Sequence, residues 1–353
     1  MEFGIQFFPD VTPQEKSGAV YFSDALALAE EADGLGFKHI RIVEHYFHHY
    51  GGYSPNPIVF LAAAAQRTRH ARLVTGAVLP AFNHPLKLAG EIGMLDAISG
   101  GRLDVGFARA FLPHEFRRFG RSPDESMARF REGVEQVDLL LTQENVSHEG
   151  RFHTIRQTTS LPRPTQRPRP KFYVAALNTA DSLAFAGRMG YSIMAIPLGG
   201  AVMRPLLAAY RDAWKAAGHS GEGEVMLAFH MFCDADGARA RAFASPFIDA
   251  YLHSLVEAAS DWLDGRTSQD YPGYDKVIAK LRESRAADQI ASGAAWIGSP
   301  DEIIAQIRRT QHEFGGSEHA SLQVNFNMVP LDDALASMRL FAERVMPYFT
   351  AKP

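Results

Sequence analysis

The stretch LVTGAVLPAFNHPLKLAGEIGMLDAISGGRLDVGF, residues 73–107, contains one complete strand–helix–strand unit. Leu73–Leu79 and Leu103–Phe107 are apolar runs of the length and composition of strands buried on both faces of a parallel sheet. Pro85–Ile98, which lies between them, has a helical pattern. Strands that alternate with helices are typical of parallel βα units, so this stretch predicts an α/β fold.

The same alternation continues along the rest of the chain. Further runs suited to buried strands are Phe3–Phe8, His39–Val43, Phe172–Ala176, Ser192–Ile196, Val225–Phe232 and Leu322–Asn327. Further helical patterns are Tyr21–Leu35, Asp124–Leu141, Ala180–Met189, Met203–Ala217, Pro300–Phe314 and Leu331–Tyr348. Eight strands, each followed by a helix, predict one (β/α)8 TIM barrel that occupies residues 1–353 as a single domain.

Two stretches interrupt this alternation. Residues 145–170, which include Gly150 and several prolines, predict a hairpin and a loop inserted before the fifth strand. Residues 260–295 predict an extra helical excursion before the last βα unit. Insertions of this kind usually shape a binding site and do not carry the fold.

Composition excludes several classes of protein. The chain has 353 residues, of which 46% are hydrophobic and 22% charged, and its net charge of −4 argues against nucleic-acid binding. The single cysteine, Cys233, rules out an internal disulfide and a thiolate zinc site. No signal-like segment and no apolar run long enough to span a bilayer is present, so we expect a cytoplasmic protein without a membrane partner.

Candidate site residues follow from the barrel, because barrel enzymes place their chemistry at the C-terminal ends of the strands. The residues expected at these ends are Glu44, His45, Gly76, Ala77, Arg109, Asn178, Thr179 and Ser182. Arg109, the hydroxyl groups and the free N–H groups of a helix start would together form a phosphate clamp. Gly76 would allow a flat ring to approach the main chain.

Each of these residues also has a purely structural interpretation. His45 is equally a polar residue at a strand end, and Arg109 is equally a surface ion-pair residue. Thr179 has the features of a helix N-cap, with Asp181 in the first turn. Gly76 alone would only interrupt a strand. Their joint placement at one mouth is what indicates a site.

Other chemistries lack their motifs. The spacing His45-x-x-His48-His49 lacks the glutamate of the zincin helix, so we expect no metal site. The chain contains neither a glycine-rich dinucleotide fingerprint, nor a phosphate-binding loop, nor a nucleophile elbow. Cys233 is expected to pack as a small hydrophobic residue. With so little nucleophilic machinery, we expect a cofactor to carry the chemistry.

Several segments together resemble the bacterial luciferase-like flavin-dependent monooxygenases, and the resemblance covers nearly the whole chain. The most characteristic segment is MLDAISGGRLDVG, residues 94–106. The others are Glu44-His45-Tyr46-Phe47, Asn56-Pro57, Leu79-Pro80, His84-Pro85, Ala108-Arg109, Phe116-Arg117-Arg118-Phe119-Gly120, Gly298-Ser299-Pro300-Asp301-Glu302 and Ser337-Met338-Arg339-Leu340-Phe341-Ala342-Glu343.

The resemblance implies reduced FMN as the cofactor. It places Arg109, Thr179 and Ser182 on the flavin phosphate, with Asn178 beside them. It places Gly76-Ala77, which in the family is often a non-proline cis peptide, against the flavin ring. His45 takes the position of the histidine implicated in proton transfer, and we expect Glu44 to orient it.

Three residues differ from the pattern of the luciferase α subunit, and these differences argue against light emission. Tyr46 replaces the second histidine of the pair, Ala108 replaces a cysteine, and Asn178 replaces a carboxylate of the luciferase α subunit. We therefore expect oxygenation of a small organic substrate by O2 through a peroxyflavin, without light. A covered, apolar mouth would protect that adduct from water. The residues expected to supply this cover are Phe7, Phe8, Phe107, Phe111 and the excursion at 260–295.

Two alternatives stay open at this point: a deazaflavin-dependent hydride-transfer enzyme of the same superfamily, and a non-catalytic flavin-binding protein. The chain has no motif for a nicotinamide dinucleotide. We therefore expect a separate NAD(P)H:flavin reductase to deliver reduced FMN by diffusion. The resemblance also implies a homodimer formed through early helices. The run Leu61–Ala65 suits close helix packing, either between two copies of the chain or on the barrel itself.

Overall fold

The computed structural model describes residues 1–176, 180–264 and 268–350. Eight parallel strands form a closed barrel, in which β1 pairs with both β2 and β11 and the ring closes through β8 and β9. These strands are β1 (Glu2–Phe7), β2 (His39–Ile42), β3 (Arg72–Val78), β4 (Leu103–Phe107), β7 (Lys171–Ala175), β8 (Ser192–Ala195), β9 (Val225–Cys233) and β11 (His319–Gln323). The predicted (β/α)8 TIM barrel is confirmed.

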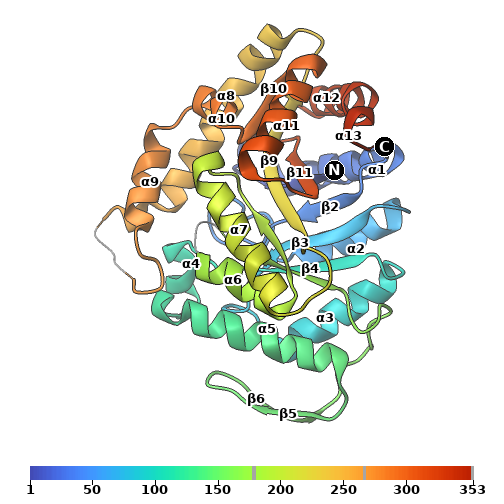
Figure 1. Cartoon of the computed structure of the whole chain (residues 1–353), viewed down its shortest axis with the longest axis vertical. Coiled ribbons are helices and arrows are strands. Elements are labelled where there is room, and N and C mark those ends of the chain that lie inside the picture. The colour runs from blue at the N-terminus through green and yellow to red at the C-terminus, as the bar shows by residue number, and fades with distance from the viewer. Residues whose placement is uncertain (177–179, 265–267, 351–353) are drawn as a thin grey trace.

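Helices surround the barrel (Figure 1). The helices that follow the first four strands are α1 (Gly18–Gly34), α2 (Pro57–Arg67), α3 (Pro85–Ile98), α4 (Pro113–Arg118), η1 (Pro123–Glu125) and α5 (Ser126–Thr142). The later helices are α6 (Ala180–Met189), α7 (Gly200–Ala216), α8 (Gly237–Ala258), η2 (Ser260–Trp262), α9 (Tyr274–Glu283), α10 (Ala286–Ala291), α11 (Pro300–Phe314), α12 (Leu331–Arg344) and α13 (Pro347–Thr350). None of the helices in the described part of the chain is long and apolar enough to cross a membrane.

Local sequence explains where several helices begin. The Asn56 side chain accepts hydrogen bonds from the backbone N–H groups of Ile58 and Val59 and so caps α2. Ser299 and Glu302 form a capping box at the start of α11. The predicted helix Leu331–Tyr348 is instead two helices, because Pro347 cannot continue an α-helical hydrogen-bond ladder.

Both predicted insertions are present. The hairpin consists of the antiparallel strands β5 (Val146–Glu149) and β6 (Thr154–Thr158), and it projects from the barrel beside α5 (Figure 1). The excursion contains η2, α9 and α10. It ends in an unpredicted strand, β10 (Ala295–Gly298), which pairs in parallel with the far end of β9. A four-residue strand is too short to show a hydrophobic period, so the sequence gives no signal for it.

The last barrel strand begins earlier than predicted, at His319 and not at Leu322. His319 contacts Glu224, with a distance of 3.0 Å between the imidazole Nε2 and a carboxylate oxygen. His319, the first residue of β11, thus belongs to an ion-pair network at the N-terminal end of the barrel. An apolar run cannot reveal residues of this kind.

Candidate active site

The C-terminal ends of three neighbouring strands carry five of the expected site residues. Glu44 and His45 follow β2 by two and three residues, Gly76 and Ala77 lie in β3, and Arg109 follows β4 by two residues. Because β2, β3 and β4 are adjacent in the barrel, these residues share one mouth.

The start of α6 carries the remaining expected residues. Ser182 lies in the first turn of this helix and is buried. The neighbouring Asp181 forms an ion pair of 2.8 Å with Arg131 of α5. Asn178 and Thr179 lie outside the described residues.

Arg109 is held by neutral groups. One guanidinium nitrogen donates to the backbone carbonyl of Asp270, at 2.5 Å, and the guanidinium carbon lies 4.5 Å from the centre of the Tyr271 ring. Among the described residues, no carboxylate lies within ion-pair distance of Arg109. A cation without a carboxylate partner at a barrel mouth is suited to bind an anion.

Arg109 and the start of α6 are attached to the same end of α5. The Asp270 side chain accepts a hydrogen bond of 2.8 Å from the backbone N–H of Met127, in the first turn of α5. Arg131, which pairs with Asp181, lies about one helical turn further along the same helix. The two parts of the expected phosphate clamp therefore lie near each other.

His45 forms its ion pair with a residue that the sequence analysis missed. Its Nδ1 atom lies 3.1 Å from a carboxylate oxygen of Glu115, a fully buried residue of α4. The same oxygen accepts a hydrogen bond of 2.8 Å from the backbone N–H of Tyr46. The expectation that Glu44 orients His45 is wrong, because the Glu44 carboxylate binds other groups. Glu115 follows a proline at a helix start, and nothing in its local pattern marks it as a partner of a residue 70 positions away.

Glu44 links the loop after β2 to the loop after β3. Its carboxylate accepts hydrogen bonds from the Tyr46 hydroxyl at 2.5 Å, the Asn83 side chain at 2.8 Å and the Leu79 backbone N–H at 3.2 Å. Burial, together with the smaller effect of the nearby charge of Glu115, raises the pKa of Glu44 to about 8 against the lowering effect of its hydrogen bonds. A buried carboxyl group that is largely protonated at neutral pH is common at functional sites.

The peptide bond between Gly76 and Ala77 is cis, as the resemblance implied. A Cβ atom on Gly76 would lie 2.0 Å from Nε of Arg41, a buried residue of β2. The Arg41 guanidinium donates a hydrogen bond of 3.1 Å to the Gly76 carbonyl. Gly76 therefore makes room for an arginine side chain, an explanation that the sequence analysis did not consider.

Two of the four phenylalanines expected to cover the mouth belong to the core instead. Phe7 packs against Phe60 of α2, and Phe107 packs against Phe172 of the next strand. Successive residues of a strand point to opposite faces. Phe7 faces the helices, so its neighbours in the chain face the barrel interior.

The other two phenylalanines lie at the mouth. The rings of Phe8 and Phe111 lie 5.4 Å and 5.9 Å from the His45 ring, respectively. The excursion contacts this region, since Trp262 donates a hydrogen bond of 2.9 Å to the Phe111 carbonyl. Tyr50 and Tyr251, whose hydroxyl groups lie 3.2 Å apart, complete the aromatic wall and were not predicted.

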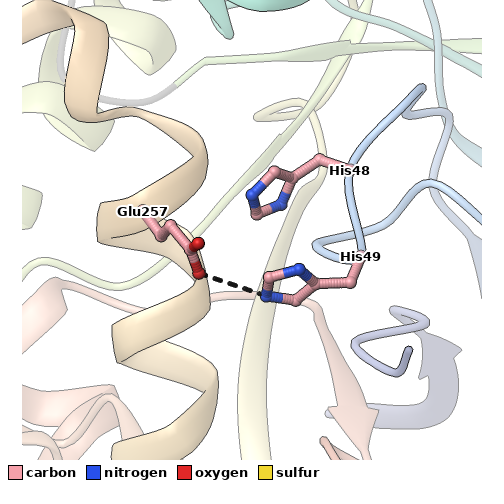
Figure 2. Close-up of side chains that lie close together, drawn as sticks. All are labelled: His48, His49 and Glu257. Atoms are coloured by element: carbon pink, nitrogen blue, oxygen red, sulfur yellow. Dashed lines mark ion pairs between the residues drawn. The ribbon is translucent and has the colours of Figure 1, made fainter. Parts of the chain in front are cut away.

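A second cluster of polar side chains lies near the same mouth (Figure 2). It consists of His48 and His49, from the loop after β2, and Glu257, from α8. One nitrogen or oxygen atom from each side chain lies within 4.8 Å of the others, and the His49 imidazole lies 3.5 Å from the Glu257 carboxylate. This set of atoms is able to hold a metal ion. His45, the third histidine of the spacing considered above, points elsewhere and contacts Glu115.

The opposite, N-terminal end of the barrel contains a cavity of about 500 Å³ lined mostly by charged residues. These residues form ion pairs with one another, such as Lys171 with Glu224 at 2.7 Å and Arg72 with Asp104 at 2.5 Å. In TIM barrels this end contributes to stability, so the cavity is not a candidate active site.

Known proteins are similar to this chain in both fold and sequence. Residues 1–318 match the family described as luciferase-like monooxygenase. The chain belongs to the luciferase-like monooxygenase family. The crystal structure of monooxygenase RslO1 from Streptomyces bottropensis is 44% identical, with a TM-score of 0.88 over 99% of this chain and 100% of that chain.

Curated relatives include members of the family with different cofactors. The oxygenase component of the flavin-dependent trigonelline monooxygenase from Acinetobacter baylyi is 32% identical over 66% of this chain and 65% of that protein. The F420-dependent glucose-6-phosphate dehydrogenase from Beutenbergia cavernae is 26% identical over 96% of this chain and 97% of that protein. For two of the curated relatives that it matches, the chain spans 56% and 65% of their length.

Proposed function

We propose that this chain is an FMN-dependent monooxygenase that uses reduced FMN and O2 to add an oxygen atom to a small organic substrate. Bound reduced FMN supplies the electrons that activate O2. In this proposal Arg109, Thr179 and Ser182 hold the flavin phosphate with Asn178 beside them, and the ring lies against Gly76-Ala77. The observation that carries the proposal is Arg109, a cation without a carboxylate partner among the described residues.

The pair of His45 and Glu115 supports a role in proton transfer. A carboxylate only accepts hydrogen bonds, so Glu115 holds the proton of His45 on Nδ1. The other ring nitrogen, Nε2, is then able to accept a proton from a group at the mouth and to return it. Glu115 stabilises the imidazolium that forms during this transfer. Phe8 and Phe111 keep water from the same space.

Electrons are proposed to come from a separate NAD(P)H:flavin reductase. The relative from Acinetobacter baylyi is named as an oxygenase component, which supports an enzyme of two components. A purified chain incubated with FMN, O2 and NADH or NADPH is then expected to oxidise no nicotinamide beyond the background rate. Addition of a flavin reductase should restore turnover. Sustained nicotinamide oxidation without the reductase would contradict this part of the proposal.

Hydride transfer with a deazaflavin is the second candidate function, and the F420-dependent relative favours it. Titration of the chain with reduced FMN and with reduced F420, followed by exposure to air, separates the candidates. We expect reduced FMN to bind more tightly and to react with O2 at a rate that the protein changes. Tight binding of F420 alone would support hydride transfer. Binding of oxidised FMN with no effect on the reaction with O2 would support a storage protein.

A further inference from the structure

Four polar side chains form a row across adjacent strands inside the barrel. Gln6 of β1 is in register with Arg41 of β2 on one side and with Gln323 of β11 on the other. Gln323 is in turn in register with His230 of β9. Because Phe7 faces the surrounding helices, Gln6 and its register partners face the barrel interior. We call these four residues the donor row.

Hydrogen bonds fix the orientation of the row. An arginine only donates, so the bond of 2.9 Å between Arg41 and Gln6 must be accepted by the Gln6 carbonyl oxygen. The amide nitrogen of Gln6 then faces the carbonyl oxygen of Gln323, at 3.4 Å. This leaves the amide nitrogen of Gln323 as a buried donor without an acceptor among the described residues.

Two further nitrogen atoms of the row lack a partner. Nε of Arg41, a donor, and Nε2 of His230, which donates or accepts according to the tautomer, are buried and have no hydrogen-bond partner in the described part of the chain. The other bonds of Arg41 go to uncharged groups, the Gln6 side chain and the Gly76 carbonyl. A buried cation is normally paired with a carboxylate, because burying an unpaired charge costs on the order of several kcal/mol in lost hydration.

The row lies beside the mouth described above. Arg41 lies in β2, four residues before His45, which follows that strand, and the Arg41 side chain lies against Gly76. The His230 ring packs edge-on against Tyr251, with 4.7 Å between ring centres. Gln6 and Arg41 are buried but not fully enclosed, since each keeps 7% of its surface exposed.

We propose that the donor row binds an anionic oxygen of the organic substrate, a carboxylate or a phenolate, at the floor of the mouth. Such a group supplies the acceptor that Arg41 and Gln323 lack, together with the missing negative charge. The aromatic rings of Phe8 and Tyr251 suit a flat, apolar remainder of the ligand. The assignment of this ligand as the substrate rests on the proposed oxygenase function.

The test compares acids with their neutral amides. Benzoate, salicylate and phenylacetate, each beside its amide, are titrated into the flavin-free chain at constant ionic strength, with calorimetry as the readout. At least one acid is expected to bind at least tenfold more tightly than its amide. Arg41→Met should weaken the binding of that acid by about 10- to 100-fold and leave the affinity of the amide unchanged. Equal binding of acid and amide in every pair, or full acid affinity in Arg41→Met, would overturn the proposal.

Two further variants complete the test. Gln323→Met removes the terminal donor without changing Arg41, and it should also weaken acid binding, so the proposal stays testable if Arg41→Met fails to fold. FMN titration of both variants shows whether the anion that binds the row belongs to the substrate or to the flavin. If either variant loses FMN affinity as strongly as acid affinity, the row serves the flavin and the substrate assignment is wrong. The acid titration uses neither flavin nor O2, so a failure of the oxygenase assay would not affect its result.

Discussion

Arg109 offers the most direct test of the proposed cofactor site. Arg109→Ala removes a charge-assisted contact to the flavin phosphate, a loss of about 1.5–3 kcal/mol, or about 10- to 100-fold in FMN affinity. Arg117→Ala is the matched control, because Arg117 lies nearby in an exposed ion pair of 2.8 Å with Asp261. Fluorescence titration with FMN measures both variants. Unchanged affinity in Arg109→Ala would remove the basis of the proposed function.

His45 and Glu115 are expected to serve chemistry more than stability. His45→Ala should keep its Tm within a few degrees of the wild type and produce H2O2 in place of oxygenated product. Glu115→Gln keeps an acceptor for Tyr46 and His45 but removes the charge that stabilises the imidazolium. As a positioning residue, Glu115 should shift the pH profile of product formation and leave FMN affinity unchanged. An unaltered pH profile would show that Glu115 acts only in folding.

Glu44 should make the stability of the chain depend on pH. Burial raises its pKa from the ordinary 4.5 to about 8, so the folded chain binds more protons than the unfolded chain between these values. Its contribution to stability is therefore fully present below pH 4.5 and is lost as the pH rises through 8. Glu44→Gln cannot titrate, so its free energy of unfolding should fall less than that of the wild type over this range. Denaturant titrations at several pH values test this, with Glu91→Gln as the control, because Glu91 is a half-buried residue of α3 far from the mouth and is paired with Lys87. Parallel curves for the wild type and Glu44→Gln would contradict the prediction.

Asp270 and Tyr271, which precede α9, brace Arg109. The Tyr271 hydroxyl donates a hydrogen bond of 2.5 Å to the Ala110 carbonyl, and the Tyr271 ring lies under the Arg109 guanidinium. Tyr271→Phe leaves that buried carbonyl without its donor, at a cost of about 1–3 kcal/mol. We expect a lower Tm and a several-fold loss of FMN affinity.

Tyr274→Phe is the control for this prediction. Tyr274 is also buried in the excursion, but its hydroxyl group makes no hydrogen bond with the described residues. Its removal should change neither Tm nor FMN affinity by a comparable amount. If both variants behave alike, the excursion covers the mouth without positioning Arg109.

At the scale of the whole molecule, the homodimer stays a prediction, and the exposed surface suggests a different interface for it from the one that the sequence suggested. In the run Leu61–Ala65, the residues Leu61, Ala64 and Ala65 are buried within the single chain and cannot contact a partner. Exposed apolar side chains lie elsewhere on the early helices. Val59 of α2 is 68% exposed and Met94 of α3 is 51% exposed. These side chains suit an interface between copies of the chain.

Light scattering tests the dimer. We expect the wild type to have twice the chain mass of 38.9 kDa. The double variant Val59→Glu/Met94→Glu should shift the species toward the monomer, because it introduces unpaired charges into the proposed interface. A substitution at the exposed Leu161, in the loop after the hairpin, is the control. A wild-type chain that scatters as a monomer at working concentration would contradict the prediction.

Local sequence patterns were enough to predict the barrel and the place of its mouth. Buried parallel strands and amphipathic helices leave local periodic patterns, and caps and prolines mark their ends. The helices Pro85–Ile98, Ala180–Met189 and Pro300–Phe314 therefore have the predicted bounds. The order of strands then placed His45, Ala77 and Arg109 at the same end of the barrel.

Only the tertiary structure decided which groups meet at that mouth. Glu115 binds His45 across 70 residues, and Arg41 occupies the space above Gly76 across 35 residues. Such pairs depend on how loops and strands pack in three dimensions, and no period or spacing in the chain encodes them. Nor does a polar residue on a buried strand show in advance whether it faces the helices or the barrel interior. Gln6, Arg41, Gln323 and His230 appeared as a single row only when the strand register was known, because register sets which side chains are neighbours.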